Sequence, residues 1–190
     1  MKKTGLFFGS FNPIHIGHLI IAEYFVENTD LDEVWFVISP SNPLKNKKSL
    51  LNERQRYYMV HIAVEDETRF RACDIELKLP IPSYTCNTLV HLTEKYPHKE
   101  FVLLMGEDNW ESIEKWKNYT YILENYHIYV YPREGYTTKN KQHPHVLFFD
   151  APKMEISATM IRESIKNQKK VKYLLPQKVE KYIDEMGAYR

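Results

Sequence analysis

Short apolar runs alternate along this chain with longer segments in which apolar residues recur at helical spacing. The runs are rich in β-branched and aromatic residues, which favour strands. They predict six strands, at residues 4–8, 34–38, 70–74, 101–105, 127–131 and 146–149. The longer segments predict helices at residues 18–26, 51–64, 84–95 and 113–116, and two more at 158–165 and 177–186.

Strands that alternate with helices predict an α/β fold, because helical crossovers cover both faces of a parallel sheet. We therefore expect a Rossmann-like, doubly wound parallel sheet that is followed by two C-terminal helices. The polar stretches that begin at Ser39 and Arg133 are interpreted as loops, since neither separates two segments that could each bury a core. The whole chain, residues 1–190, is predicted to form a single domain.

Composition and charge exclude several function classes. The 190 residues are 43% hydrophobic and 27% charged, and 26 basic against 25 acidic residues leave a net charge of +1. No overall field would attract nucleic acid or an anionic membrane, so neither is expected as a partner. The first apolar run ends at Phe8, too early for a signal sequence or a membrane span, which predicts a cytoplasmic protein. Cys73 and Cys86 share no metal-ligand spacing and are predicted to be small buried hydrophobes.

The stretch GSFNPIHIGH, residues 9–18, follows the first predicted strand. In an open parallel sheet this loop is the usual phosphate site, and Gly9 and Gly17 would let the backbone approach a ligand closely. The following helix offers unpaired N–H groups to an anion, and His15 and His18 add donors beside them. An isolated histidine here would more often be a capping or surface residue, but two that flank a glycine favour function. The loop matches neither a P-loop nor a dinucleotide fingerprint, and the other histidines form no zinc-ligand cluster.

A second candidate stretch is ISATMIRESI, residues 156–165, near the other end of the chain. Ser157 and Thr159 suit a helix start, and Arg162 lies one turn further on, where its guanidinium can reach a phosphate at that terminus. The alternative is a plain capped helix with an exposed arginine. This stretch alone does not decide between the two.

Together, His15-x-Gly17-His18 and Ser157-x-Thr159-x-x-Arg162 resemble the motif pair of the His-x-Gly-His nucleotidyltransferase superfamily. PSYTCNTL from Pro82, GEDNW from Gly106 and the later Trp116 are similar to segments of its nicotinate-nucleotide adenylyltransferase family. The resemblance runs nearly end to end. The resemblance departs where NPLKNK replaces the family's usual Pro-Pro-His-Lys, so that Leu44 stands in place of a histidine while Lys45 remains. Phosphate contact by this loop would then come from Lys45, with Arg54 or Arg56 as further candidates.

The resemblance implies transfer of the adenylyl group from ATP to nicotinate mononucleotide, which gives nicotinate adenine dinucleotide and pyrophosphate in NAD biosynthesis. It implies Mg²⁺ held by the ATP phosphates, with no metal ligand from the protein. The implied catalytic residues are His15, His18 and Arg162. The implied ATP-binding residues are these three and Gly9, Ser10, Phe11, Gly17, Gly106, Asp108, Ser157 and Thr159, and the implied residues for nicotinate mononucleotide are Lys45, Tyr84, Thr85 and Trp116.

Several alternatives stay open at this point. Asp108 either contacts the ribose of adenosine or caps a helix, and Trp116 either stacks on the pyridinium ring or lies in the core. Ser83, Tyr84 and Thr85 open a predicted helix, whose start favours a carboxylate over a carboxamide. The rival functions are a sister enzyme that couples CTP to phosphopantetheine, choline phosphate or glycerol phosphate, and a catalytically idle nucleotide-binding module. The sequence does not decide whether the protein forms a homo-oligomer.

Overall fold

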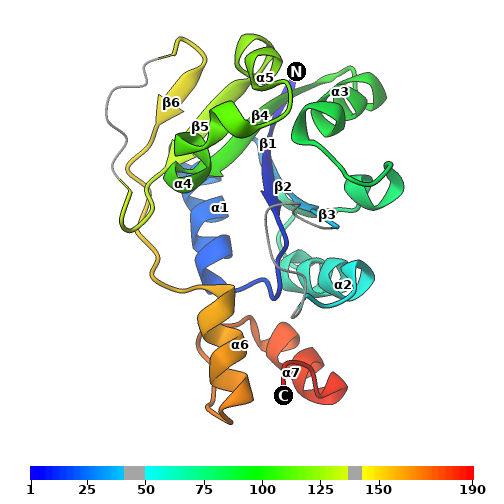
Figure 1. Ribbon diagram of the computed structural model, residues 1–190, viewed down its shortest axis with the longest axis vertical. Helices are drawn as coiled ribbons and strands as arrows, with labels where there is room; N and C mark the ends of the chain where they lie inside the picture. Colours follow the sequence, from blue (N-terminus) through cyan, green and yellow to red (C-terminus); the bar gives the residue numbers. More distant parts are fainter. Residues whose placement is uncertain (41–49, 137–142) are drawn as a thin grey trace.

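A six-stranded parallel sheet forms the centre of the protein (Figure 1). The computed structural model describes residues 1–40, 50–136 and 143–190. The strand order is β3-β2-β1-β4-β5-β6, and every neighbouring pair is parallel. The strands are β1 Lys2–Gly9, β2 Glu33–Ile38, β3 Phe70–Cys73, β4 Lys99–Gly106, β5 His127–Tyr131 and β6 Val146–Phe148. The predicted doubly wound α/β fold is confirmed.

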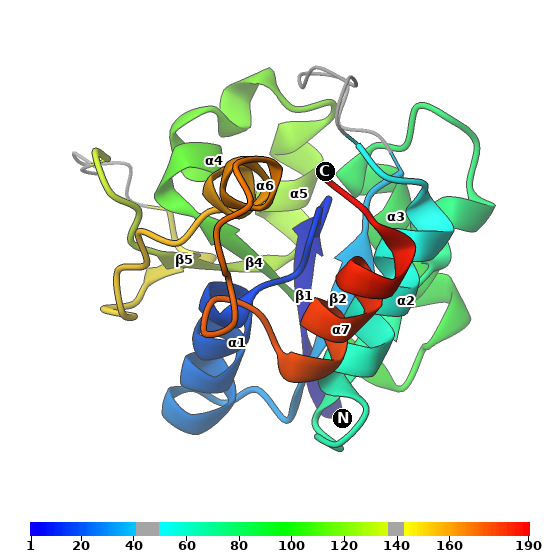
Figure 2. The same cartoon turned by 90° about the horizontal axis from the view of Figure 1, so that it is seen from below.

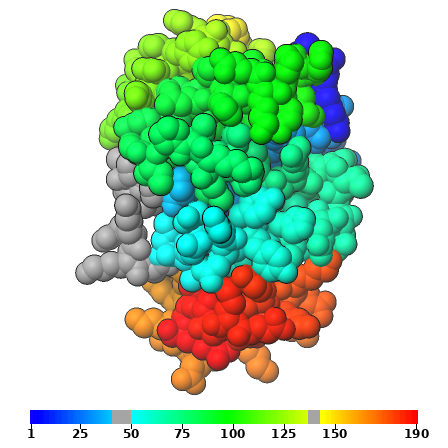
Figure 3. Space-filling model, turned by 90° about the vertical axis from the view of Figure 1, so that its right-hand side faces the viewer, coloured from blue at the N-terminus to red at the C-terminus, as the bar shows by residue number. Residues whose placement is uncertain are grey.

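Helices connect the strands, and the two C-terminal helices lie beyond the carboxyl edge of the sheet. The described α-helices are α1 Ile16–Asn28, α2 Glu53–Val64, α3 Thr85–Lys95, α4 Glu107–Glu111, α5 Tyr119–Asn125, α6 Ala158–Lys166 and α7 Gln177–Met186, and the 3₁₀ turns are η2 Ile75–Lys78 and η3 Ile113–Lys115. Seen from below, α6 and α7 lie in front of the carboxyl ends of the strands (Figure 2). On one outer face, α3, α2 and α7 are stacked from top to bottom (Figure 3). No helix in the described ranges is long and apolar enough to cross a membrane.

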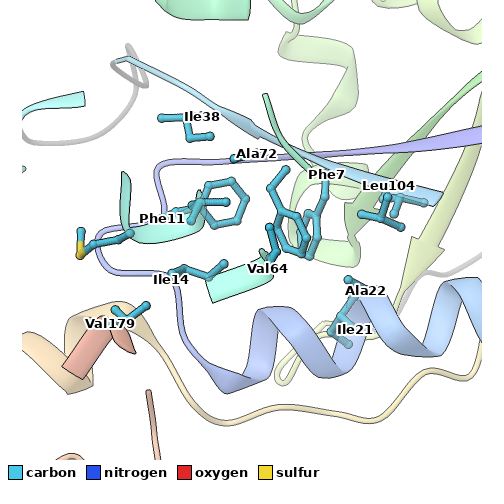
Figure 4. Packing of buried hydrophobic residues seen from close by; sticks show 14 of the residues in the cluster. Phe7, Phe11, Ile14, Ile21, Ala22, Ile38, Val64, Ala72, Leu104 and Val179 are labelled. Atoms are coloured by element: carbon cyan, nitrogen blue, oxygen red, sulfur yellow. The ribbon is translucent and has the colours of Figure 1, made fainter. Parts of the chain in front are cut away.

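Alternate strand residues pack on opposite faces of the sheet, because successive side chains of a strand point to opposite sides. One face packs against α1, α2, α6 and α7, and Figure 4 shows part of this cluster around Phe7, Phe11 and Leu104. The other face packs against α3, α4 and α5, and its strand residues include Leu6, Trp35, Leu103 and Ile128. Both faces are therefore buried, as the apolar runs predicted.

The differences from the predicted elements are local. The helices α4 and α5 were not predicted, since five and seven residues are too short to establish an apolar period. The helix predicted at residues 113–116 is the 3₁₀ turn η3. The helix predicted from residue 51 begins at Glu53, because the Asn52 side chain caps it by accepting a hydrogen bond from Arg54 N. Cys73 and Cys86 are both buried and free, as expected.

Candidate active site

In the loop between β1 and α1, the side chains pack tightly against the backbone of the same loop. Phe11 has a φ of 45°, in the left-handed region, and the residue is 2% exposed. A Cβ on Gly9 would lie 2.9 Å from the Phe11 ring, and one on Gly17 would lie 3.1 Å from His15 Nδ1. Both glycines therefore make room for side chains of this loop, not only for a ligand as the sequence suggested. The Phe11 side chain lies in the core. Only the backbone of this residue can therefore face a nucleotide.

His15 and His18 lie against each other at the start of α1. Their rings stack with centroids 3.7 Å apart, and His15 N donates a hydrogen bond of 3.2 Å to His18 Nδ1. Because Nδ1 of His18 accepts, its neutral ring carries the proton on Nε2. The two imidazoles are thus placed together, as the motif predicted.

Burial keeps His15 neutral. Its side chain is buried, and its Nδ1 has no hydrogen-bond partner among the described residues. Desolvation lowers the pKa of His15 to about 4, and the positive charge of Arg133 acts in the same direction. At neutral pH this ring is therefore a hydrogen-bonding group without charge. An unpaired nitrogen in a buried site costs about 1–3 kcal/mol, which suits a position that a ligand contacts.

The second motif reaches this loop through Arg162. Ser157 caps α6, with its side chain accepting from Met160 N at 3.2 Å. Arg162 Nη1 donates to Asn12 O at 2.8 Å and Nη2 donates to Thr159 Oγ1 at 3.2 Å. The first of these bonds joins positions 150 residues apart. The two motifs therefore meet at the carboxyl edge of the sheet, and the reading of residues 156–165 as a plain capped helix does not account for this contact.

A pocket opens between the carboxyl ends of β1 and β5 and the segment before α6. Its lining includes His15, Gly17, His18, Tyr131, Arg133 and Ile156. Arg133 lies in a polar stretch that was predicted to be a loop, with no functional role. The signal was present, because Arg133 is the second residue after β5, at the edge where ligands bind in open parallel sheets.

Asp108 and Arg133 form the side of the site near β4. Arg133 Nε lies 3.6 Å from Asp108 Oδ1, and Arg133 N donates to Glu107 Oε2 at 3.0 Å. A Cβ on Gly106 would lie 2.5 Å from Asp108 Oδ1, so this glycine lets the pair approach the strand end. The N-cap of α4 is Gly106, which makes Asp108 the second residue of the helix. The alternative of Asp108 as a helix cap is therefore wrong.

A second group of predicted residues lies beside α3. Tyr84 is the N-cap of α3 and Thr85 is its first residue, as the sequence predicted within one residue. Tyr84 and Trp116 are both half-buried at the margin of the same apolar cluster, and Lys117 Nζ lies 4.3 Å from the centroid of the Tyr84 ring. Trp116 is thus not a core residue. Lys45 and Leu44 lie outside the described residues.

The buried carboxyl of Glu76, which was not predicted, lies near this group. Glu76 is 3% exposed and accepts a hydrogen bond of 2.8 Å from Thr88 Oγ1. Burial raises the pKa of Glu76, while hydrogen bonds from Thr88, Ser39 and Ser83 act against that rise. The carboxyl thereby joins the end of β2 to the start of α3. A glutamate between Ile75 and Leu77 gives no sequence signal for its own burial.

Arg56, one sequence-based candidate for phosphate contact, is buried among backbone carbonyl groups. Its side chain is fully buried and donates to the carbonyl oxygens of Ser10, Ser39, Pro40 and Leu51. These bonds satisfy most of its N–H groups, so that it fixes the loops after β1 and β2. Arg54, the other candidate, is exposed on α2.

Replacing Arg56 by methionine is expected to lower the free energy of unfolding by at least about 3 kcal/mol, because several buried carbonyl groups lose their donors together. Urea denaturation measures the change. Arg54→Met, on the exposed side of the same helix, is the matched control and is expected to change stability by at most about 0.5 kcal/mol. Equal effects of the two substitutions would show that the Arg56 bonds do not stabilise the fold.

Among the described residues, no three His, Cys, Asp or Glu side chains are arranged to hold a metal ion. The donors at the site are instead imidazoles, guanidinium groups and helix amides, which suit phosphate oxygens. This donor set fits a Mg²⁺ ion that is carried by nucleotide phosphates, since Mg²⁺ keeps several waters and is often held by substrate.

The chain resembles known proteins over nearly its whole length. The family model described as cytidylyltransferase-like matches residues 6–164. Probable nicotinate-nucleotide adenylyltransferases from Flavobacterium psychrophilum and Cytophaga hutchinsonii are 54% and 50% identical, and the alignments cover 99% and 95% of both chains. The Plasmodium falciparum nicotinic acid mononucleotide adenylyltransferase complexed with NaAD has the same fold, with a TM-score of 0.82, 19% identity and coverage of 100% of this chain and 98% of that one. The protein described here belongs to the nicotinate-nucleotide adenylyltransferases, within the cytidylyltransferase-like family.

Proposed function

We propose that this protein transfers the adenylyl group of ATP to nicotinate mononucleotide and releases pyrophosphate, a step of NAD biosynthesis. The observation that carries the proposal is the hydrogen bond from Arg162 to Asn12 O, which brings both nucleotidyltransferase motifs to one edge of the sheet. The names of the relatives that are 54% and 50% identical support this pair of substrates.

The chemistry makes modest demands on the protein. A phosphate oxygen of nicotinate mononucleotide forms a bond to the α-phosphorus of ATP, and the bond from that phosphorus to the bridging oxygen breaks, so that pyrophosphate leaves. The attacking phosphate is already anionic at neutral pH and needs no strong base. The site must instead hold two anions together and stabilise the charge that develops on the leaving group. Bound Mg²⁺ would supply neutralising charge on the ATP phosphates.

Donors around the pocket are suited to this task. His18 and neutral His15 contribute two stacked imidazoles, and Arg133 and Arg162 add positive charge. The first turn of α6 offers backbone amides and the Thr159 hydroxyl to the outer phosphates. Near β4, the backbone at Gly106 and the carboxylate of Asp108 would hold the adenosine. The backbone of Gly9, Ser10, Phe11 and Gly17 completes the proposed ATP site.

The α3 side of the site is proposed to bind nicotinate mononucleotide. The amides at the start of α3 and the hydroxyl of Thr85 can receive a carboxylate, and Lys117 adds a cation beside Tyr84. The half-buried Trp116 can stack on the pyridinium ring, whose positive charge adds attraction to the aromatic face. The proposed contact of Lys45 with this substrate stays a prediction.

The purified protein is expected to release pyrophosphate faster with nicotinate mononucleotide than with nicotinamide mononucleotide, by about 10- to 30-fold in kcat/KM. A carboxylate at a helix start gains up to about 2 kcal/mol, which corresponds to this ratio, while a neutral carboxamide gains little. The assay contains ATP and Mg²⁺, and chromatography identifies the dinucleotide product. CTP in place of ATP is the control. Equal rates for both mononucleotides would contradict the proposed carboxylate site. The absence of product from either mononucleotide would refute the proposed function.

A further inference from the structure

Asn12 contacts three distant parts of the protein, two through its side chain and one through its main-chain oxygen. Asn12 is 3% exposed, and its Oδ1 accepts hydrogen bonds from Tyr189 Oη at 2.7 Å and from Leu51 N at 3.2 Å. Its main-chain oxygen accepts the bond from Arg162. Asn12 therefore contacts both Tyr189 and the Arg162 guanidinium.

Tyr189 belongs to the segment that follows α7. This segment runs back from α7 toward the carboxyl end of β1 (Figure 2). Its backbone turns at Gly187, with a φ of 62°, and Tyr189 itself has a φ of 65°. An aromatic residue rarely adopts this left-handed conformation, so its surroundings must hold it there. Packing against the α1 and α2 side of the core and the bond to Asn12 do so.

The Tyr189 hydroxyl remains a hydrogen-bond donor because it stays protonated. Burial raises the pKa of Tyr189 well above its ordinary value, although the positive charges of Arg162 and Arg56 act against the rise. The hydroxyl therefore stays protonated throughout the neutral range. A second contact supports the same region, since Leu174 O, between α6 and α7, accepts a hydrogen bond from Ile16 N at 3.0 Å.

We infer that Tyr189 is a positioning residue for the ATP phosphate site and acts through Asn12 on Arg162. The inference rests on the proposed function of that site. Tyr189 acts indirectly: its hydroxyl holds the Asn12 side chain, and the Asn12 main-chain oxygen accepts a hydrogen bond from the guanidinium. Residues beside α3 are not part of this chain of contacts, so the effect is confined to ATP.

Tyr189→Phe tests the inference, because it removes only the hydroxyl. We expect the KM for ATP and the Kd for ATP, measured by equilibrium binding without the second substrate, to rise about tenfold. The KM for nicotinate mononucleotide is expected to stay within about twofold, and the melting temperature to fall by at most about 4 °C. Tyr173→Phe, on a tyrosine that is 84% exposed, is the matched control and is expected to behave like the wild type.

Asn12→Ala removes the same contact from the opposite side and completes a double-substitution cycle. If Tyr189 acts through Asn12, the Kd for ATP of the double variant equals that of Asn12→Ala alone. Additive effects, an unchanged Kd in Tyr189→Phe, or a loss that is confined to the melting temperature would each overturn the inference. Because ATP binding is measured without turnover, failure of the proposed reaction leaves this test intact.

Discussion

Replacing His18 by alanine is expected to lower kcat about 10²–10³-fold, the usual loss when one donor to a developing negative charge is removed. His18 is held for this role at the start of α1, where its Nδ1 accepts a hydrogen bond from His15 N. The stability cost should be about 1–2 kcal/mol, since the substitution removes mainly the bond from His15 N, the stacked contact with His15 and the edge contacts with Phe7 and Phe11. Pyrophosphate release measures kcat, and a thermal melt measures stability.

A histidine outside the site provides the control for this substitution. His91 is exposed on α3, and His91→Ala is expected to keep wild-type turnover and melting temperature. Near-normal turnover in His18→Ala would remove His18 from the mechanism. A large fall in melting temperature together with turnover would make its role structural. Only loss of turnover in a stable protein supports the proposed donor.

The fold could be predicted because its elements repeat a strong and simple pattern. Strands such as β2 and β4 are buried on both faces, and their unbroken apolar runs leave no other assignment. The short helices α4 and α5 lack such a pattern and depend on packing against the sheet. Local sequence therefore specified the layers of the fold, while the details of the crossover after β4 required tertiary contacts.

The site was predictable only where its residues form a local motif. His15 and His18 lie together because one helical turn places them so, and Ser157 caps α6 by a local bond. Contacts between distant residues left no such pattern. The bond between Tyr189 and Asn12, the buried Arg56 and the pair of Arg133 with Asp108 appear only when the chain is folded.

Arg162→Lys is expected to lower kcat/KM about 100-fold, although the positive charge is kept. The guanidinium of Arg162 donates to Asn12 O and Thr159 Oγ1 from two different nitrogens, and its planar fork leaves further N–H groups for phosphate. A lysine ammonium is a compact point charge and cannot make these contacts from one position. Arg71→Lys, on an exposed arginine of β3, controls for the change of side chain. Turnover of Arg162→Lys within a few-fold of wild type would mean that charge alone suffices, and that the shared geometry of Arg162, Thr159 and Asn12 does not matter for the reaction.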